Sequence, residues 1–355
     1  MGIDWSIALA SAFVGFSVGL TGVGGGALMT PILLIFFGIN PTAAVSSELV
    51  AAMVIKPVGA GVHIRRGTVR WELVKWLCVG SIPAAFAGVF ILHSSGESAS
   101  VEAVTKTFLG WTLALAAGAM VFRAWLQGRR SAAARAGKRV TFLPGQTLHV
   151  RIVPTILIGV VGGMLVGLTS VGSGSIVIVG LMLLYPSLRG GHLVGTDLAQ
   201  ATPLVASAAL AHIMVGDFRV GLTVSLLIGA LPAVYVGARL SSRAPDGLIR
   251  PILVLVLFAS GMKLLDVPTM QLGLLLLGVV LIGLPAWGAV DAATHPESAW
   301  ERSGMRRADW IKWQIAGAPI GIGFPVAVAY FAKARRQLLA ISAAEAADQK
   351  VGSER

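Results

Sequence analysis

Two glycine- and hydroxyl-rich sequences, far apart in the chain, have the composition of an anion-binding turn. Residues 19–26 read Gly-Leu-Thr-Gly-Val-Gly-Gly-Gly, and residues 167–174 read Gly-Leu-Thr-Ser-Val-Gly-Ser-Gly. Each sequence interrupts an apolar stretch, so we expect a half-length helix to begin after it and to expose main-chain N–H groups at its N-terminus. Such a terminus carries roughly half a positive charge together with unsatisfied donors, which suits an anion. The predicted substrate-binding residues of the two turns are Thr21, Gly22, Gly24, Gly25, Gly26, Thr169, Ser170, Gly172, Ser173, Gly174 and Ser175.

Ionisable residues follow both turns inside long apolar stretches. Glu48 and Asp197 occupy equivalent places, and Lys56 lies eight residues after Glu48, on roughly the same face of a helix. Because ionisable groups inside a membrane are usually functional, we expect Lys56 to neutralise a bound anion and the two acids to carry protons. His63 and His212 end equivalent apolar stretches and are further candidates for proton transfer.

Each of these patterns also has a purely structural interpretation. Glycines permit close packing of membrane helices. Glu48 and Asp197 would complement a helix dipole from its first turn, with Ser46 or Thr196 as the cap. Lys56 would extend toward the basic end of its helix near His63, and the histidines would stabilise helix C-termini. The presence of both breaks at equivalent positions favours the binding interpretation of the glycines.

Motifs for catalysis, cofactors or metals are absent from the sequence. It has no G-x-x-x-x-G-K-S/T, no H-E-x-x-H and only one cysteine, Cys78, so we expect no ATP hydrolysis and no zinc site. Residues 172–174, Gly-Ser-Gly, resemble the nucleophile region of an intramembrane serine protease, for which His192 or His212 would have to face Ser173. This remains a disfavoured alternative, and we expect no enzyme activity, cofactor or metal ion.

The composition shows which elements must position these residues. The chain has 355 residues, of which 55% are hydrophobic and 12% charged, with a mean hydropathy of +0.82. A soluble chain carries roughly 25% charged residues, so a soluble enzyme, a disordered chain and a secreted disulfide scaffold are excluded. Since a membrane helix needs about 20 apolar residues, we expect an all-α polytopic membrane protein. The expected spans are 43–63, 71–92, 101–122, 192–215, 220–240, 248–265, 272–289 and 311–331, with broken helices over 5–37 and 152–185.

The two turns belong to an internal repeat. Gly19 aligns with Gly167 at a shift of 148 residues, and downstream residues 45–49 match 194–198 at a shift of 149. His63, Gly67 and Arg70 match His212, Gly216 and Arg219 at the same shift. The expected organisation is a first transmembrane repeat over 1–127, a basic cytoplasmic linker over 128–151, a second repeat over 152–265, and an extension over 266–355 with one or two transmembrane helices and a polar tail.

The distribution of charge predicts the orientation of the repeats. The loop after the second span of the first repeat holds four basic residues against one acid, whereas its counterpart holds Arg219 against Asp217. Basic residues in short loops mark the cytoplasmic side, so we expect inverted-topology repeats whose broken helices are re-entrant. The net charge of +12 reflects a basic loop rather than a nucleic-acid partner. The basic residues of this expected loop are Arg123, Arg129, Arg130, Arg135, Lys138, Arg139 and Arg151.

In combination, these residues resemble the TauE/SafE family of sulfite exporters. The resemblance covers residues 5–265 and is carried by the doubled glycine-rich turn, by Ser47-Glu48-Leu49 and Thr196-Asp197-Leu198, and by residues 63–69. It implies a multi-pass transporter of small anions, typically sulfite or organosulfonates, in the plasma membrane, with residues 19–26 and 167–174 as the substrate region. This sequence departs from the family in placing Glu48 and Asp197 where many members have serine, in matching Gly25 with Ser173, and in the added region after residue 265.

We therefore expect a secondary transporter of small oxyanions, with protons as the candidate coupling ion. An uncoupled, channel-like anion permease is the main alternative, ahead of the intramembrane serine protease. The expected partners are a small anionic substrate and the lipid bilayer, without nucleic acid and without an assigned oligomeric state.

Overall fold

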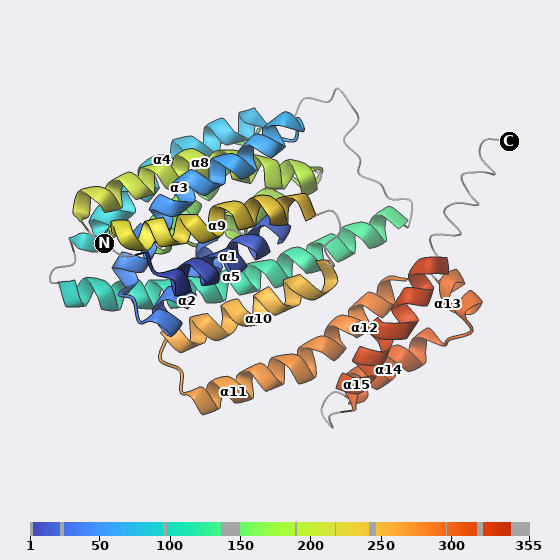
Figure 1. Cartoon of the computed structure of the whole chain (residues 1–355). Coiled ribbons are helices and arrows are strands. Elements are labelled where there is room, and N and C mark those ends of the chain that lie inside the picture. The colour runs from blue at the N-terminus through green and yellow to red at the C-terminus, as the bar shows by residue number, and fades with distance from the viewer. Residues whose placement is uncertain are drawn as a thin grey trace. The chain divides into compact units, whose positions relative to one another are not determined.

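The chain is helical throughout the part that a computed structural model describes (Figure 1). The described residues are 3–21, 25–94, 98–135, 150–188, 190–216, 218–240, 246–295, 297–317 and 322–341. They form two compact units, one within residues 1–123 and 141–267 and the other within 124–140 and 268–355. The helices that contribute to the first unit are α1 Trp5–Thr21, α2 Gly26–Phe37, α3 Pro41–Arg65, α4 Trp71–His93, α5 Ser98–Arg135, α6 Ile152–Thr169, α7 Ile176–Leu184, α8 Gly190–Val215, α9 Val220–Leu240 and α10 Asp246–Leu264.

Six helices within the described residues are long and apolar enough to cross a membrane. They are α3, α4, α6, α8, residues 100–127 of α5 and residues 220–237 of α9. Large apolar side chains such as Phe13, Leu115 and Val153 stay exposed on the outer faces of the first unit. Such faces suit contact with lipid rather than with water. The polytopic helical membrane fold predicted from the composition is thus confirmed.

Both long apolar regions that carry a glycine-rich sequence are divided into two helices, as predicted. The first region ends α1 at Thr21 and resumes with α2 at Gly26. The second ends α6 at Thr169 and resumes with α7 at Ile176. Between α6 and α7 the chain turns through positive φ at Ser170 (61°), Gly172 (134°) and Gly174 (88°). Glycine enters this left-handed region at no steric cost, which explains why the helix is interrupted there.

Two close helix pairs join the sequence repeats. Helix α1 packs along α9, and α6 packs along α4. A Cβ on Gly15 of α1 would lie 2.8 Å from Ala230 Cα, and one on Gly163 of α6 would lie 2.6 Å from Ser81 Cα. Because no side chain fits between the backbones, glycine is required at both positions. The packing interpretation of glycine therefore holds in the middle of α1 and α6.

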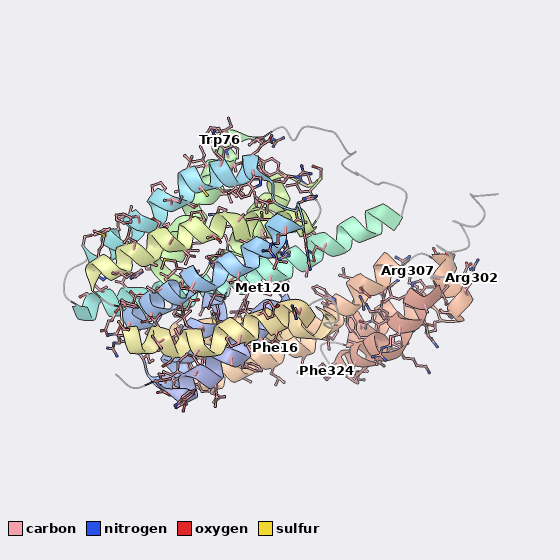
Figure 2. All side chains as sticks on the ribbon, turned by 45° about the horizontal axis from the view of Figure 1, so that its top comes forward. Phe16, Trp76, Met120, Arg302, Arg307 and Phe324 are labelled. Atoms are coloured by element: carbon pink, nitrogen blue, oxygen red, sulfur yellow. The ribbon has the colours of Figure 1, made fainter. Side chains whose placement is uncertain are left out.

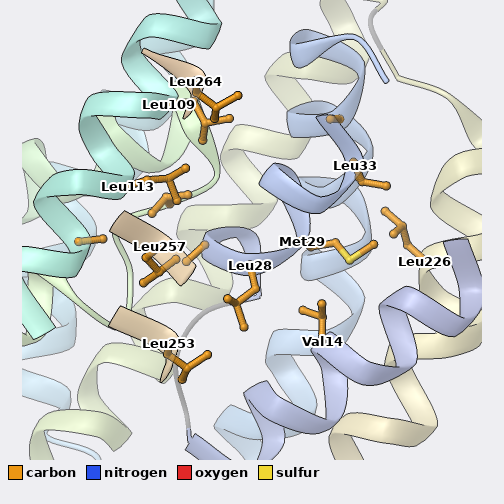
Figure 3. Close-up of a cluster of buried hydrophobic side chains, with 14 of the residues drawn as sticks. Val14, Leu28, Met29, Leu33, Leu109, Leu113, Leu226, Leu253, Leu257 and Leu264 are labelled. Atoms are coloured by element: carbon orange, nitrogen blue, oxygen red, sulfur yellow. The ribbon is translucent and has the colours of Figure 1, made fainter. Parts of the chain in front are cut away.

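The half-length helix α2 is enclosed by a cluster of buried apolar side chains (Figure 3). Leu28, Met29 and Leu33 of α2 pack against Val14 of α1 and Leu226 of α9. The same cluster continues through α5 and α10. Its members there include Leu109, Leu113, Leu253, Leu257 and Leu264. A buried Leu or Met side chain contributes about 1.5–3 kcal/mol relative to an exposed one, so the start of α2 is held firmly inside the unit.

The second unit contains the helices of the C-terminal extension. They are α11 Thr269–Gly278, the π-helical turn η2 Val279–Gly283, α12 Leu284–Thr294, α13 Glu297–Ser303, α14 Arg307–Gly317, α15 Gly323–Ala329 and η3 Tyr330–Ala334. Arg302 and Arg307 lie on α13 and at the start of α14 (Figure 2). The segment between the expected spans 272–289 and 311–331 is thus largely helical.

The expected span over residues 311–331 lies partly outside the described residues, because 318–321 are not among them. Helix α14 ends at Gly317, and a separate helix, α15, begins at Gly323. Pro325 lies in the first turn of α15, where proline is well tolerated.

Candidate functional site

The two helix breaks lie against each other inside the first unit. A Cβ on Gly26, the first residue of α2, would lie 2.4 Å from both the carbonyl oxygen and Oγ of Ser170. The Ser170 hydroxyl donates a hydrogen bond to Oε2 of Glu48 on α3. A Cβ on Gly25 would lie 3.4 Å from the other oxygen of that carboxylate, Glu48 Oε1. The start of α2, the turn before α7 and the Glu48 carboxylate therefore share one small volume.

Lys56 joins this contact from the next turns of α3. Its Nζ donates a 2.8 Å hydrogen bond to Ser173 Oγ in the turn before α7. The ammonium group interacts electrostatically with Glu48 and with Asp197 of α8. Both carboxylates are buried, with exposed fractions of 5% for Glu48 and 2% for Asp197. The orientation of Lys56 toward Ser173 contradicts the alternative in which it extends to the basic end of α3 near His63.

Arg123 of α5 supplies a second cation that the sequence analysis had assigned to the basic loop. Its Nη1 donates a 3.4 Å hydrogen bond to the carbonyl oxygen of Gly174, and its charge acts on Asp197. A main-chain hydrogen bond from Gly174 also reaches Asp197. Helix α5 continues through Arg123 to Arg135, so this residue lies inside a helix and not in a loop. The available signal was its apolar surroundings, Met120-Val121-Phe122 before it and Ala124-Trp125-Leu126 after it.

The two acids do not lie in the first turns of their helices. Helix α3 begins at Pro41, with Asn40 as the cap whose side chain accepts hydrogen bonds from the N–H groups of Thr42 and Ala43. Glu48 is consequently the eighth residue of α3, and Asp197 is the eighth residue of α8, which begins at Gly190. The dipole-complementing interpretation of these acids is therefore wrong.

Ser46 and Thr196, the caps proposed with those acids, have other contacts. Ser46 Oγ donates to Ala43 O at 3.2 Å, inside α3. Thr196 Oγ1 accepts a 3.1 Å hydrogen bond from the main-chain N–H of Arg70. In an equivalent contact, the N–H of Arg219 donates to Ser47 Oγ at 3.3 Å. Since Ser47 and Thr196 directly precede Glu48 and Asp197, these bonds fix both acid-bearing helix segments to the loop of the other repeat.

The histidines make their described contacts away from this cluster. His63 Nδ1 lies 3.0 Å from Thr68 Oγ1. His212 Nε2 lies 2.9 Å from the carbonyl oxygen of Gly167, and its ring meets that of His93 edge-on with centroids 6.3 Å apart. His192 Nδ1 lies 3.0 Å from the carbonyl oxygen of Thr68. The protease alternative therefore lacks a histidine partner among the described contacts of its serine.

The remaining predicted residues of the second turn shape the backbone. Thr169 Oγ1 donates to Leu165 O at 2.6 Å and accepts from the N–H of Val171 at 3.2 Å. Ser175 is buried at the N-cap position of α7, without a side-chain capping bond. In the first turn, the Thr21 side chain, Gly22 and Gly24 lie outside the described residues.

The main-chain donors at the start of α7 are partly used inside the turn itself. The N–H groups of Ile176 and Val177 donate to the carbonyl oxygen of Gly172 at 3.1 and 3.4 Å. These two groups are thus not the open donors that the sequence predicted. The side chains of Lys56, Arg123, Ser170 and Ser173 supply hydrogen-bond donors at this contact. Among the described residues, no group of three or more His, Cys, Asp and Glu side chains could hold a metal ion.

Comparison with known proteins shows that the chain is similar to known membrane proteins. The chain matches the family described as "Sulfite exporter TauE/SafE" over residues 7–264. It is 38% identical over 261 residues to the "Probable membrane transporter protein YjnA" of Bacillus subtilis (strain 168), covering 73% of this chain and 99% of that relative. The "Probable membrane transporter protein YdhB" of the same organism is 23% identical over 260 residues, with the same two coverages. No solved structure matches the chain.

Proposed function

The chain belongs to the sulfite exporter TauE/SafE family of membrane transporters, and we propose that it is a secondary transporter that moves a small oxyanion together with protons. The proposed substrates are sulfite or an organosulfonate, and the proposed location is the plasma membrane. The observation that carries this proposal is the cluster of two cations, two carboxylates and two serine hydroxyls where the helix breaks meet.

The cations and hydroxyls of the cluster match the chemistry of an oxyanion. The ammonium group of Lys56 has three donors and gives one to Ser173, so the same group can also bind a substrate oxygen. Ser170 and Ser173 place hydroxyl groups beside it, on the turn before α7. Arg123 adds the positive charge that a second oxygen of the substrate requires. Hydrogen bonds of this kind, between a charged group and an anion, contribute about 1.5–3 kcal/mol each.

The two buried carboxylates make binding of an anion depend on protons. Two like unit charges 4 Å apart repel by about 4 kcal/mol at an effective dielectric constant of 20. A repulsion of this size weakens anion binding about a thousandfold, since 1.4 kcal/mol corresponds to a factor of 10. Protonation of Glu48 or Asp197 removes it. Anion and proton binding therefore favour each other by the same factor.

Ser170 links the protonation of Glu48 to the number of hydrogen-bond donors that the protein can offer to the substrate. While Glu48 is ionised, the Ser170 hydroxyl donates to its Oε2 atom. A protonated carboxyl group is itself a donor, so the hydroxyl of Ser170 becomes available to an anion. The same event thus removes a negative charge and provides a hydrogen-bond donor.

We further propose that the two sequence repeats are inverted in the membrane and exchange roles during transport. The support is the pair of equivalent hydrogen bonds, from the N–H of Arg70 to Thr196 and from the N–H of Arg219 to Ser47. The pairing of α1 with α9 and of α6 with α4 has the same reciprocal form. Repeats related in this way are the usual basis of alternating access in transporters with broken helices.

Transport by purified protein in proteoliposomes tests this function. A sulfite gradient should drive saturable uptake accompanied by proton movement, measured with an internal pH indicator. Glu48→Gln and Asp197→Asn should each lower the number of protons that move with the substrate, whereas Glu72→Gln, at an exposed position of α4, should leave this number unchanged. Conductance that does not saturate with sulfite, or coupling unchanged in both cluster variants, would contradict the proposal and favour a channel-like permease.

A further inference from the structure

The charges at the contact between the helix breaks sum to zero when every group is ionised. Lys56 and Arg123 contribute two positive charges, and Glu48 and Asp197 contribute two negative charges. Within the described part of the chain, the electrostatic partners of the two acids and of Lys56 all belong to this set of four. The set is therefore a balanced charge cluster.

The two kinds of charge differ in how they relate to the repeat. The acids are repeated, because Glu48 and Asp197 are equivalent at a shift of 149 residues. The lysine is not repeated, because the residue equivalent to Lys56 at the same shift is Val205, a fully buried side chain on α8. The two acids thus occupy equivalent positions of the repeats, whereas the cations that balance them are a lysine on α3 and an arginine on α5.

Burial makes an imbalance in this cluster costly. Taking an uncompensated charge out of water carries a large desolvation penalty, which a partner of opposite sign offsets. A buried carboxylic acid can avoid the penalty by binding a proton, whereas an arginine stays charged. Since the only groups of the cluster that can accept protons from the fully ionised state are the two acids, at most two extra negative charges can be balanced.

We propose that the cluster stays neutral when empty and when loaded, so that it takes up one proton for each negative charge of the substrate. This inference rests on the proposed transport function and specifies its substrate class. A monoanionic sulfonate brings one proton, and a dianion such as sulfite brings two, one on each acid. Anions with more than two charges are excluded. Transport is electrically silent, because substrate and protons cross together.

Proton uptake on binding measures this stoichiometry directly. Binding of methanesulfonate to the purified, detergent-solubilised protein is followed by calorimetry in two buffers with different ionisation enthalpies. The expected uptake is one proton for methanesulfonate, and two for sulfite at a pH at which sulfite is mainly the dianion. In Glu48→Gln, one acid is missing, and each value should fall by one. Equal uptake for the two ligands would overturn the inference.

Arg123 provides a sharper test, because its loss changes how much negative charge of a ligand the cluster can neutralise by taking up protons. In Arg123→Met, one acid must be protonated before any ligand binds, which leaves a single acid to balance a ligand. Both ligands lose the contact with Arg123, but binding of dianionic sulfite should fall at least tenfold more than binding of methanesulfonate. Arg66→Met, at an exposed position, is the matched control and should bind both ligands as the unmodified protein does. A parallel loss of both ligands in Arg123→Met would overturn the assignment.

Uptake under a clamped membrane potential separates this inference from the proposed function. With valinomycin and potassium setting the potential, sulfite uptake by proteoliposomes should be independent of voltage and respond to a pH gradient. Uptake that changes several-fold with voltage would refute the neutral cluster while leaving a sulfite transporter. Absence of any uptake of sulfite or sulfonate would refute the proposed function itself.

Discussion

Lys56 and Ser173 are separated by 117 residues in sequence, yet a 2.8 Å hydrogen bond joins Nζ of the lysine to Oγ of the serine. This bond ties the middle of α3, in the first repeat, to the turn before α7, in the second repeat. It also explains how a lysine is held at depth in an apolar unit, where a charged group costs on the order of 2.5–3.5 kcal/mol on insertion scales.

The first prediction concerns the two sides of this bond. Lys56→Met should weaken sulfite binding about tenfold to a hundredfold, because one charge-assisted interaction contributes about 1.5–3 kcal/mol. Ser173→Ala removes a neutral hydroxyl and should weaken it only about fivefold. Titration calorimetry of the detergent-solubilised protein gives both values. Lys75→Met, at an exposed position on α4, should have no effect, and comparable losses for Lys56 and Lys75 would argue against the site.

The second prediction uses the backbone of Ser170, which has φ of 61° where the first repeat has Gly22. Ser170→Gly and Ser170→Ala both remove the hydroxyl that donates to Glu48, but only glycine adopts this φ without strain. The glycine variant should therefore be more stable than the alanine variant by about 1 kcal/mol. Unfolding of the two variants in the same detergent measures the difference, and equal stability would show that the turn relaxes.

The third prediction concerns the contact between the breaks. Gly26→Ala places a Cβ 2.4 Å from Ser170 O and Oγ, so the breaks must separate and sulfite transport should be lost. Gly61→Ala on α3 is the control, because a Cβ there meets nothing within 4 Å. Alanine also favours a helix over glycine by up to about 1 kcal/mol, so this control should be as stable as the parent or more so. Full transport by Gly26→Ala would show that the two turns need not touch.

The fourth prediction concerns the C-terminal extension. The family match ends at residue 264, and the match to YjnA covers 99% of that relative with only 73% of this chain. A chain that ends after Val267 should therefore retain coupled sulfite transport in proteoliposomes within about twofold, because the four charged side chains and both breaks precede that point. Loss of transport with a monodisperse, folded protein would instead assign the extension a role in the cycle.

The amino-acid sequence predicts the long helices and both breaks, because apolar runs and glycines act locally. The expected span over 220–240 coincides with α9, and the break before Ile176 lies where the glycines predicted it. Ser46 resembles a cap and so suggests too shallow a position for Glu48, whereas Asn40 followed by Pro41 is the stronger start signal.

Arg123 was missed for a different reason. Basic residues follow it from Arg129 onward, and proximity in sequence alone groups Arg123 with them. Its partner, Gly174, lies 51 residues further along the chain. A contact of this kind depends on how α5 packs against the turn before α7, and no local pattern in the sequence encodes it.

The difference between Lys56 in the first repeat and Val205 at the equivalent position of the second repeat has a kinetic consequence. A carrier whose halves exchange shapes would, with Lys56 opposite Val205, present different binding surfaces to the two sides of the membrane. Half-saturating concentrations measured from inside and outside would then differ. Equal and opposite gradients would drive unequal initial fluxes, so the protein would act as a partial rectifier while obeying the same equilibrium.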